Sequence, residues 1–526
     1  MTRVNSEGTT HAPAVAGDAR ARGHAGPTEP TRDGAGPGRY LGIAPGEDRY
    51  RWVAMGVVLI GTFMVILDTT IVNVALPQIG IALGRQSGID WIVTAYLLAV
   101  GLAQPATGWL ADRYGRKRMF IISLVLFATG SLLAALAPNL EVLVAFRVVQ
   151  GLGGGALMPV GMAMIYELFP PDRRGMALGV WGVAAMAGPA FGPVIGGWLV
   201  TTVSWHWLFL INVPIGAIGV VAAMRLLRDT GYREHRPLDA IGLSLVSAGL
   251  VLWLLTFAQA PDWGWHSPLT TGCLAVGALL LALFVTWERR VAHPAIDVTM
   301  FRVPIFTLTM VVIALLVVVQ FSILVFVPLL LQTVRGMTAL RVGTMLVPVA
   351  VAAAISFPIG GRLTDRIGPR VPVTLGAMLL VVSGWILGHL SVDSSTVTVE
   401  VALVAQGLGF GFAMMPCAVT GMNVLPGRFV AQASAVRQLN VRVAASFGIA
   451  VLSGIVVARI GVVSAAGPDQ IAPEIAQAAY NQVFVVAAGV GLVAATLALF
   501  LPGRARTARI LAERAEEHRE LVLDVA

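Results

Sequence analysis

The residue whose chemistry stands out most is Asp68, an acidic side chain in the middle of the apolar run 52–77. An isolated carboxylate is costly in hydrocarbon, so an ionisable residue within a membrane span is a functional candidate by default. Burial favours the neutral acid and a nearby cation favours the carboxylate, so such a group can change protonation when its surroundings change. Proton coupling requires that behaviour. The alternative is a structural carboxylate that is hydrogen-bonded between helices.

Arg147 is the natural partner of this acid. Asp68 lies nine residues before Pro77, where its apolar run ends, and Arg147 lies eight residues after Asn139, where the fourth run begins. If the two helices run in opposite directions, both side chains sit roughly 12–14 Å below the same surface. Gln150 follows nearly one turn deeper and could hydrogen-bond either side chain. The alternative for Arg147 is an ion pair that only fixes packing.

Composition places these residues in an all-α polytopic membrane protein. Of 526 residues, 57% are hydrophobic and only 12% are charged, which is atypical of a soluble domain of this length. A membrane span needs about 20 apolar residues, and fourteen candidate spans are present. They are roughly residues 52–77, 90–111, 118–137, 141–165, 175–202, 206–228, 239–258, 269–288, 304–332, 341–361, 371–391, 398–423, 434–459 and 480–502.

The basic residues are concentrated in alternate loops, including those at 113–118, 225–236 and 362–370. By the positive-inside rule these loops are cytoplasmic, so both termini are cytoplasmic and the number of spans is even. The net charge of +8 is therefore explained by orientation, and no nucleic-acid partner is expected. Lys117 is the only lysine, and the strong bias to Arg, with abundant Ala, Gly and Val, indicates a GC-rich bacterial genome.

An internal repeat divides the chain. GWLADRYGRK at residues 108–117 recurs as GRLTDRIGPR at 361–370, and QGLG at 150–153 recurs at 406–409. Parallel repeats of this kind build transporters from two related bundles. The expected parts are residues 1–48 as a disordered cytoplasmic tail, 49–230 as an N-terminal six-helix bundle, 231–300 as an inserted seventh and eighth helix with linkers, 301–502 as a C-terminal six-helix bundle, and 503–526 as a cytoplasmic C-terminal tail.

The first copy of the repeat has the residues of a gate. Gly115 suits a tight turn, and Asp112 can pair with Arg116 or lie at a neighbouring helix N-terminus, where the helix dipole favours an anion. Such contacts would hold one face of the protein closed and break as the bundles rock. The alternative is charge that serves only to orient the chain. The candidate gating residues are Gly108, Asp112, Arg113, Gly115, Arg116 and Lys117.

The fifth apolar run is unusually rich in glycine and proline. In a soluble helix each interior Gly costs about 1 kcal/mol relative to Ala. In a bilayer, small residues let helix backbones approach closely, and Pro kinks are tolerated. These residues could belong to a helix interface that takes part in transport, or they could only allow two helices to pack closely. The spaced residues are Gly179, Gly188, Gly192, Pro193, Gly196 and Gly197.

Four motifs resemble those of the major facilitator superfamily, and in particular its fourteen-helix drug:proton antiporters of the EmrB/QacA type. LDTTIVNVALP at residues 67–77 resembles the first-helix signature, and residues 108–117 resemble the loop between helices 2 and 3. RVVQG at 147–151 resembles the fourth-helix motif, and residues 179–197 resemble the antiporter signature of helix 5. The resemblance extends over about residues 50–502. It implies the major facilitator fold, and it implies a role for the fourth-helix arginine in proton transfer.

Evidence on the substrate is thinner. Met and aromatic side chains suit adaptable apolar binding, although ordinary packing explains each of them singly. The last six spans hold no acidic residue near their middle, whereas family members that export divalent cations tend to have extra buried acids. Neutral or singly charged lipophilic molecules are therefore expected. The candidate pocket residues are Met158, Met162, Trp181, Met186 and Met414.

Together these features predict a proton-coupled antiporter of the bacterial inner membrane that exports lipophilic drugs or antibiotics by alternating access. Protons and membrane lipids are its other expected partners, the proton gradient replaces any cofactor, and a monomer is expected. The sequence contains no catalytic constellation or metal-ligand cluster, so neither an enzyme nor a metal site is expected. The alternative is a dedicated exporter of a single endogenous metabolite or of a lipid.

Overall fold

The computed structural model describes residues 48–85, 87–170, 173–229, 237–265, 267–426, 429–464, 473–507 and 509. All regular structure in this part of the chain is helical. The predicted N-terminal tail, apart from Asp48, and most of the predicted C-terminal tail lie outside the described residues.

The first half of the chain forms six of the predicted spans. Its first five spans are single helices, and its sixth is made by two consecutive helices. They are α1 (Asp48–Ala82), α2 (Trp91–Tyr114), α3 (Arg116–Ala135), α4 (Leu140–Leu168), α5 (Arg174–Thr202), and α6 (Trp207–Leu210) with α7 (Asn212–Leu226).

The rest of the chain forms the inserted pair and the second set of six helices. The inserted helices are α8 (Ala240–Trp263) and α9 (Pro268–Glu288), followed by a short 3-10 helix, η1 (Val298–Arg302). The last six are α10 (Pro304–Thr333), α11 (Ala339–Ile367), α12 (Arg370–Gly388), α13 (Thr396–Asn423), α14 (Val430–Ser464) and α15 (Pro473–Ala498).

The predicted spans all fall on these helices. Within the described residues, thirteen spans are long and apolar enough to cross a membrane. The remaining predicted span, α5, is not among these thirteen, although its 29 residues extend about 43 Å and so exceed the roughly 30 Å of a bilayer core. The all-α polytopic fold predicted from the sequence is therefore confirmed. Several helix ends differ from the predicted spans: α14 begins at Val430 rather than at residue 434, and α15 covers Pro473–Ala498 rather than residues 480–502.

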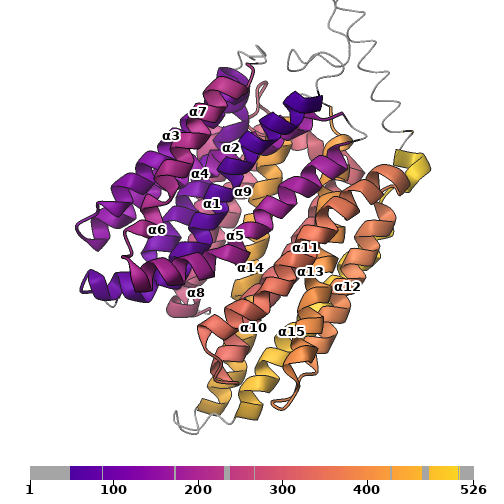
Figure 1. The fold of residues 1–526 in the computed structure, drawn as a ribbon. Helices are drawn as coiled ribbons and strands as arrows, with labels where there is room; N and C mark the ends of the chain where they lie inside the picture. The colour runs from indigo at the N-terminus through magenta and orange to yellow at the C-terminus, as the bar shows by residue number, and fades with distance from the viewer. Residues whose placement is uncertain are drawn as a thin grey trace, which may run out of the picture.

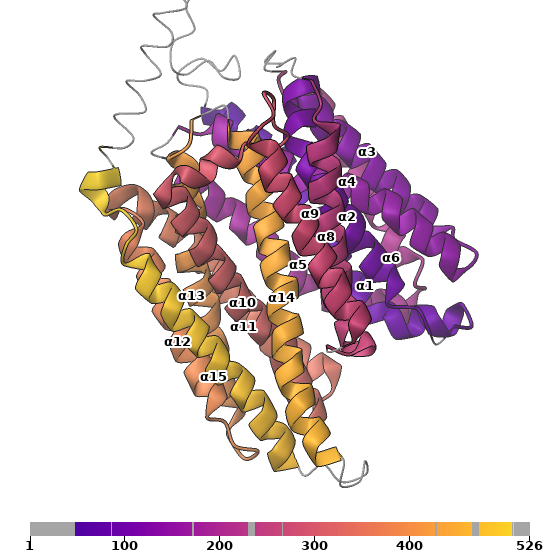
Figure 2. The ribbon, with the colours of Figure 1, turned by 180° about the vertical axis from the view of Figure 1, so that it is seen from behind.

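The helices form two bundles that lie side by side (Figure 1). Helices α1–α7 make one bundle and α10–α15 make the other, and the two meet where α5 packs against α11 and α2 packs against α14. The inserted helices α8 and α9 lie beside each other behind this junction, and α8 contacts both α2 and α14 (Figure 2). The inserted pair therefore bridges the bundles along one side.

The two copies of the sequence repeat form equivalent turns. Gly115 ends α2 with φ of 88°, and Gly368 ends α11 with φ of 86°. Only glycine adopts such angles without strain, so both tight turns depend on it. We call the end of the molecule that carries these two turns the basic end. The start of α1 and the end of α15 lie at this same end (Figure 1).

Candidate functional site

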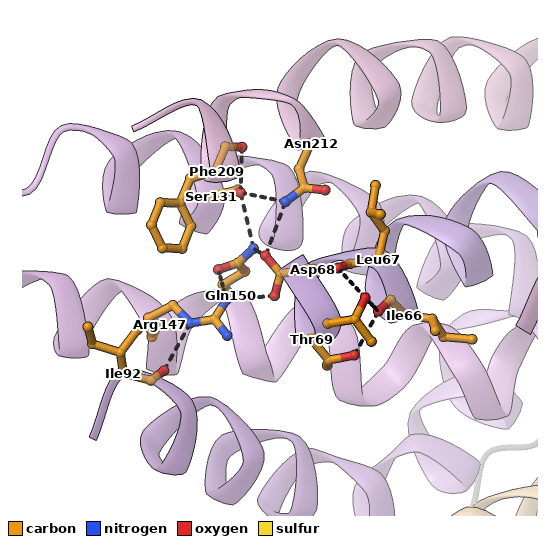
Figure 3. Close-up of polar contacts among 11 residues, drawn as sticks. Ile66, Leu67, Asp68, Thr69, Ile92, Ser131, Arg147, Gln150, Phe209 and Asn212 are labelled. Atoms are coloured by element: carbon orange, nitrogen blue, oxygen red, sulfur yellow. Dashed lines mark hydrogen bonds and ion pairs between the residues drawn. The ribbon is translucent and has the colours of Figure 1, made fainter. Parts of the chain in front are cut away.

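Three of the predicted residues meet inside the first bundle. Asp68, Arg147 and Gln150 have no exposed surface. Arg147 Nη1 donates to Asp68 Oδ2 at 2.6 Å and to Gln150 Oε1 at 2.6 Å. Gln150 Nε2 donates to the other carboxylate oxygen, Asp68 Oδ1, at 2.8 Å (Figure 3). The three side chains therefore close a ring in which both carboxylate oxygens accept hydrogen bonds.

Two further residues, Asn212 and Ser131, hydrogen-bond to this ring, and neither was identified from the sequence. Asn212 at the start of α7 donates from Nδ2 to Asp68 Oδ1 at 3.1 Å and to Ser131 Oγ at 3.1 Å. Ser131 on α3 also accepts from Gln150 Nε2 at 3.1 Å and donates to the Phe209 carbonyl at 2.9 Å (Figure 3). A lone Asn within an apolar span was the available signal, because a polar residue at membrane depth usually has a partner.

Arg147 is held from a third side by α2. Its Nε donates to the Ile92 carbonyl at 3.1 Å, and its guanidinium carbon lies 4.1 Å from the centre of the Tyr96 ring. Three buried polar atoms around the ring have no hydrogen-bond partner among the described residues, namely Arg147 Nη2, Asn212 Oδ1 and the Tyr96 hydroxyl. Leaving a buried donor or acceptor unpaired costs about 1–3 kcal/mol. Unpaired hydrogen-bonding atoms of this kind are typical of a site that rearranges.

Ser131 offers a direct test of the network. Ser131→Ala is expected to lower the free energy of unfolding by about 1–2 kcal/mol, because it leaves one donor each of Gln150 and Asn212 without a partner and removes a donor to the Phe209 carbonyl. The measurement is unfolding in mixed detergent and SDS micelles, followed by tryptophan fluorescence. Ser322→Ala on α10 is the matched control, since Ser322 is equally buried but, within the described residues, its hydroxyl bonds only to the carbonyl of Val319 in its own helix. An equal loss in the two variants would contradict a supporting role for Ser131.

The residues of the predicted gating loop hold the ends of four helices together, namely α2, α3, α4 and α7. Arg116 is buried, forms an ion pair with Glu167 at the end of α4, and lies 3.8 Å from Asp112 Oδ1 through its Nη2. Lys117 Nζ donates to the Met224 carbonyl of α7 at 3.0 Å, while Arg113 is partly exposed. Glu167 was not identified from the sequence because the predicted fourth span ended at residue 165, whereas α4 continues to Leu168.

Both copies of the repeat also reach the opposite bundle. A methyl group added to Gly108 on α2 would lie 3.3 Å from the backbone of Gln432 on α14. In the second copy, Asp365 Oδ2 accepts from the Met176 amide at 3.3 Å, in the first turn of α5. An acidic group is stabilised there by the helix dipole. The sequence favoured a gating role for the first copy, and the structure places the second copy at the bundle junction as well.

The glycines of α5 allow close packing against two different helices, α11 and α1. Near the basic end, a methyl group added to Gly179 would lie 2.6 Å from the Phe357 carbonyl oxygen of α11. Further along, Gly188, Gly192 and Gly196 contact α1, the helix that carries Asp68. Of the remaining predicted residues, Gly197 has no neighbour among the described residues within 4 Å of an added methyl group, and the side chain of Pro193 lies outside the described residues.

Two of the predicted pocket residues meet an arginine that was not singled out from the sequence. Arg437 on α14 donates to Met162 Sδ from Nε at 3.1 Å and from Nη2 at 2.6 Å. Its guanidinium carbon lies 5.9 Å from the ring of Trp181, whose indole donates to Thr62 Oγ1 at 3.0 Å. The other three predicted pocket residues are buried or half-buried in the apolar core that also contains Met162 and Trp181. They are Met158, Met186 and Met414.

Comparison with known proteins identifies the relatives of this chain. It is 34% identical over 397 residues to the multidrug export protein EmrB of Haemophilus influenzae, covering 74% of this chain and 77% of the relative. It is 33% identical over 416 residues to the tetracenomycin C resistance and export protein of Streptomyces glaucescens, covering 78% and 77%. Among solved structures, the human organic anion transporter MFSD10 superimposes with a TM-score of 0.60 at 17% identity, covering 86% of this chain and 100% of that one, which supports the fold alone.

The sequence model that describes the Major Facilitator Superfamily matches residues 58–449, which include the ring around Asp68 and most of the helices of both bundles. The match is to a family of transporters rather than of enzymes, and the relatives at about one-third identity include multidrug exporters. This chain is therefore a multi-pass membrane transporter that belongs to the major facilitator superfamily.

Proposed function

We propose that the protein is a proton-coupled antiporter that exports lipophilic drugs or antibiotics across the bacterial inner membrane. The observation that carries the proposal is the buried ring of Asp68, Arg147 and Gln150, in which one carboxylate is held by one guanidinium. The basic end faces the cytoplasm, both termini are cytoplasmic, and the monomer works in lipid without a cofactor. The relatives named for multidrug export support this choice of substrate.

Contacts between the bundles support alternating access. At the basic end, Arg174 Nη1 donates to Asn423 Oδ1 at 2.8 Å and the Tyr166 hydroxyl donates to the Ala418 carbonyl at 3.2 Å. Gly179 and Gly197 lie eighteen residues apart on α5, about five turns, and therefore face the same way. Gly179 meets the backbone of α11, whereas Gly197 has open space beside it. The arrangement fits a state that is closed on the cytoplasmic side, with the bundles apart towards the outside.

The ring and the gate are joined through α5. A proton that arrives from outside neutralises Asp68 and removes the charge that holds Arg147 Nη1. Loss of this ion pair weakens the contact between α4 and α1. Helix α1 in turn packs against α5, where Thr70 Oγ1 donates to the Gly188 carbonyl at 3.1 Å. Movement of α5 then separates Gly179 from α11 and opens the basic end to substrate. Proton release to the cytoplasm restores the ion pair and closes that end behind the substrate.

The test is drug-driven proton movement in inverted membrane vesicles. Addition of a transported drug to energised vesicles is expected to dissipate the pH gradient with the wild-type protein. Asp68→Asn is expected to abolish this response, because an amide keeps the size of the side chain but cannot take up a proton. Asn212→Asp is a useful companion, since it places a second carboxyl next to Asp68 and is expected to shift the pH dependence of transport. Equal responses of wild type and Asp68→Asn would overturn the assignment.

A narrower substrate range is the second candidate function. The relative from Streptomyces glaucescens is named for resistance to, and export of, one compound, tetracenomycin C. A dedicated exporter of one metabolite would confer resistance to few members of a chemically mixed panel of drugs. Resistance to several unrelated lipophilic drugs, lost in Asp68→Asn, would instead favour the multidrug function. Export of a lipid is distinguished by transport of labelled phospholipid in the same vesicles.

A further inference from the structure

Ionisable side chains are rare in the membrane interior of this protein, and their signs are unequal. Within the described helices, four charged residues lie at least seven residues from either helix end. Asp68 and Arg147 neutralise each other in the ring. The other two, Arg437 and Arg442, are both bases on α14. Acidic residues of the second bundle lie near helix ends, so the region where α14 faces the first bundle carries surplus positive charge.

Arg437 is the better defined of these two bases. It is only 1% exposed, and no carboxylate of the described residues lies within ion-pair distance of it. Its hydrogen-bond acceptor is the sulfur of Met162, which is a weak acceptor, and its aromatic neighbour is Trp181. A buried charge without a counter-ion costs several kcal/mol in real proteins. If the contact served only to pack the bundles together, an apolar residue would serve better.

The surroundings of Arg437 define what could satisfy it. The guanidinium fork matches a carboxylate in a planar, bidentate arrangement, and it is always charged. Met162 on α4 and Trp181 on α5 supply an adaptable thioether and a flat apolar wall. The indole of Trp181 is fixed by its hydrogen bond to Thr62. Arg437 belongs to the second bundle, whereas Met162 and Trp181 belong to the first, so Arg437 moves away from both when the bundles part.

The depth of Arg437 and Trp181 in the membrane indicates when these side chains become accessible. Arg437 and Trp181 each lie seven residues after the first residue of their helices, at Val430 and Arg174. At 1.5 Å per residue both are about 10 Å inside the basic end. Separation of the bundles at that end would break the contact of Arg437 with Met162 and expose an unpaired cation to the compartment on that side.

We propose that Arg437 anchors the carboxylate of a lipophilic aromatic substrate, which replaces the thioether of Met162 when the basic end opens. The inference rests on the proposed export function, because it names the substrate class that the transporter takes from the cytoplasm. The surplus of positive charge on α14 attracts an anion into this site and disfavours organic cations. The aromatic part of the substrate lies against Trp181.

The experiment compares three probes that share a pyrene ring and an alkyl chain and differ in charge: pyrenebutyric acid, its neutral methyl ester, and a pyrenylalkyl trimethylammonium cation. Binding to the full-length protein in lipid nanodiscs is followed by energy transfer from tryptophan to pyrene. Wild type is expected to bind the acid more tightly than the ester or the cation. Arg437→Gln is expected to weaken binding of the acid by about tenfold to a hundredfold, with little effect on the ester, because a charge-assisted hydrogen bond is lost.

Two variants separate an anchor from a packing residue. Arg437→Lys keeps the charge and is expected to retain part of the preference for the acid. Met162→Leu removes the sulfur acceptor but keeps the apolar volume, and its preference for the acid is expected to be unchanged or larger. Equal weakening of acid and ester binding in Arg437→Gln would show that Arg437 only shapes the interface. Absence of any preference for the acid in wild type would also overturn the proposal.

The outcome is independent of proton coupling. Binding is measured without a proton gradient, and Asp68→Asn is expected to keep the preference for the acid. If Asp68→Asn abolishes drug-driven proton movement but wild type shows no preference for the acid, only the anchoring role of Arg437 fails. If the acid binds through Arg437 but no drug moves protons, the antiport mechanism fails and the binding site stands.

Discussion

Replacing Arg147 with methionine is expected to lower the free energy of unfolding by about 3–5 kcal/mol, because it leaves Asp68 as a buried carboxylate without its cation. Arg147 Nη1 lies 2.6 Å from Asp68 Oδ2, and both side chains are fully buried. The substitution also removes the donor to the Ile92 carbonyl and the stacking on Tyr96. The measurement is unfolding of the purified variant in mixed detergent and SDS micelles.

Two controls identify the cause of this loss. The double variant Asp68→Asn with Arg147→Met removes the stranded charge and is expected to recover at least half of the lost stability, which a double-mutant cycle quantifies. Arg437→Met removes another fully buried arginine, which has no carboxylate partner among the described residues, and it is expected to cost much less. If the double variant were as unstable as Arg147→Met alone, the ion pair would not be the source of the effect.

Replacing Gly179 with valine is expected to prevent the bundles from closing at the basic end. An added methyl group would lie 2.6 Å from the Phe357 carbonyl oxygen and 2.7 Å from Pro358 Cα, and these backbone atoms cannot move aside as a flexible side chain would. Overpacking of this kind costs about 1–3 kcal/mol, which shifts the equilibrium between closed and open states by about 5- to 150-fold. Gly197→Val is the matched control, because Gly197 lies on the same face of the same helix and an added methyl group there would have no neighbour within 4 Å in the part of the chain that the structure describes.

The measurement uses a cysteine that reports opening. In a background with the two native cysteines replaced by serine, Asn423→Cys places a thiol where α13 meets Arg174 of α5. Gly179→Val is expected to raise the rate of labelling by a membrane-impermeant maleimide applied from the basic side, and to reduce drug export in parallel. Gly197→Val is expected to leave the labelling rate unchanged. Equal labelling in all three backgrounds would mean that the contact between α5 and α11 does not control access.

The order of the helices and their depth in the membrane follow from local features of the sequence. Apolar runs long enough to span a bilayer are local features, and so is the alternation of basic and acidic loops. Depth along a helix follows from counting residues, so the sequence alone predicts that Asp68 and Arg147 lie at one level in the membrane. The repeat at residues 108–117 and 361–370 predicted two related turns, and both are present with glycine at positive φ.

Which side chains face one another depends on how the helices pack and is seen only in the folded structure. A soluble helix marks its inner face with apolar residues, but a membrane helix is apolar on the side facing lipid and on the side facing protein. The sequence pattern therefore does not encode the rotation of each helix about its axis. That rotation brings Asn212 and Ser131 to Asp68, and it turns Arg437 towards Met162 of the opposite bundle. It also divides the glycines of α5 between α11 and α1, because each neighbour takes a different face of the same helix.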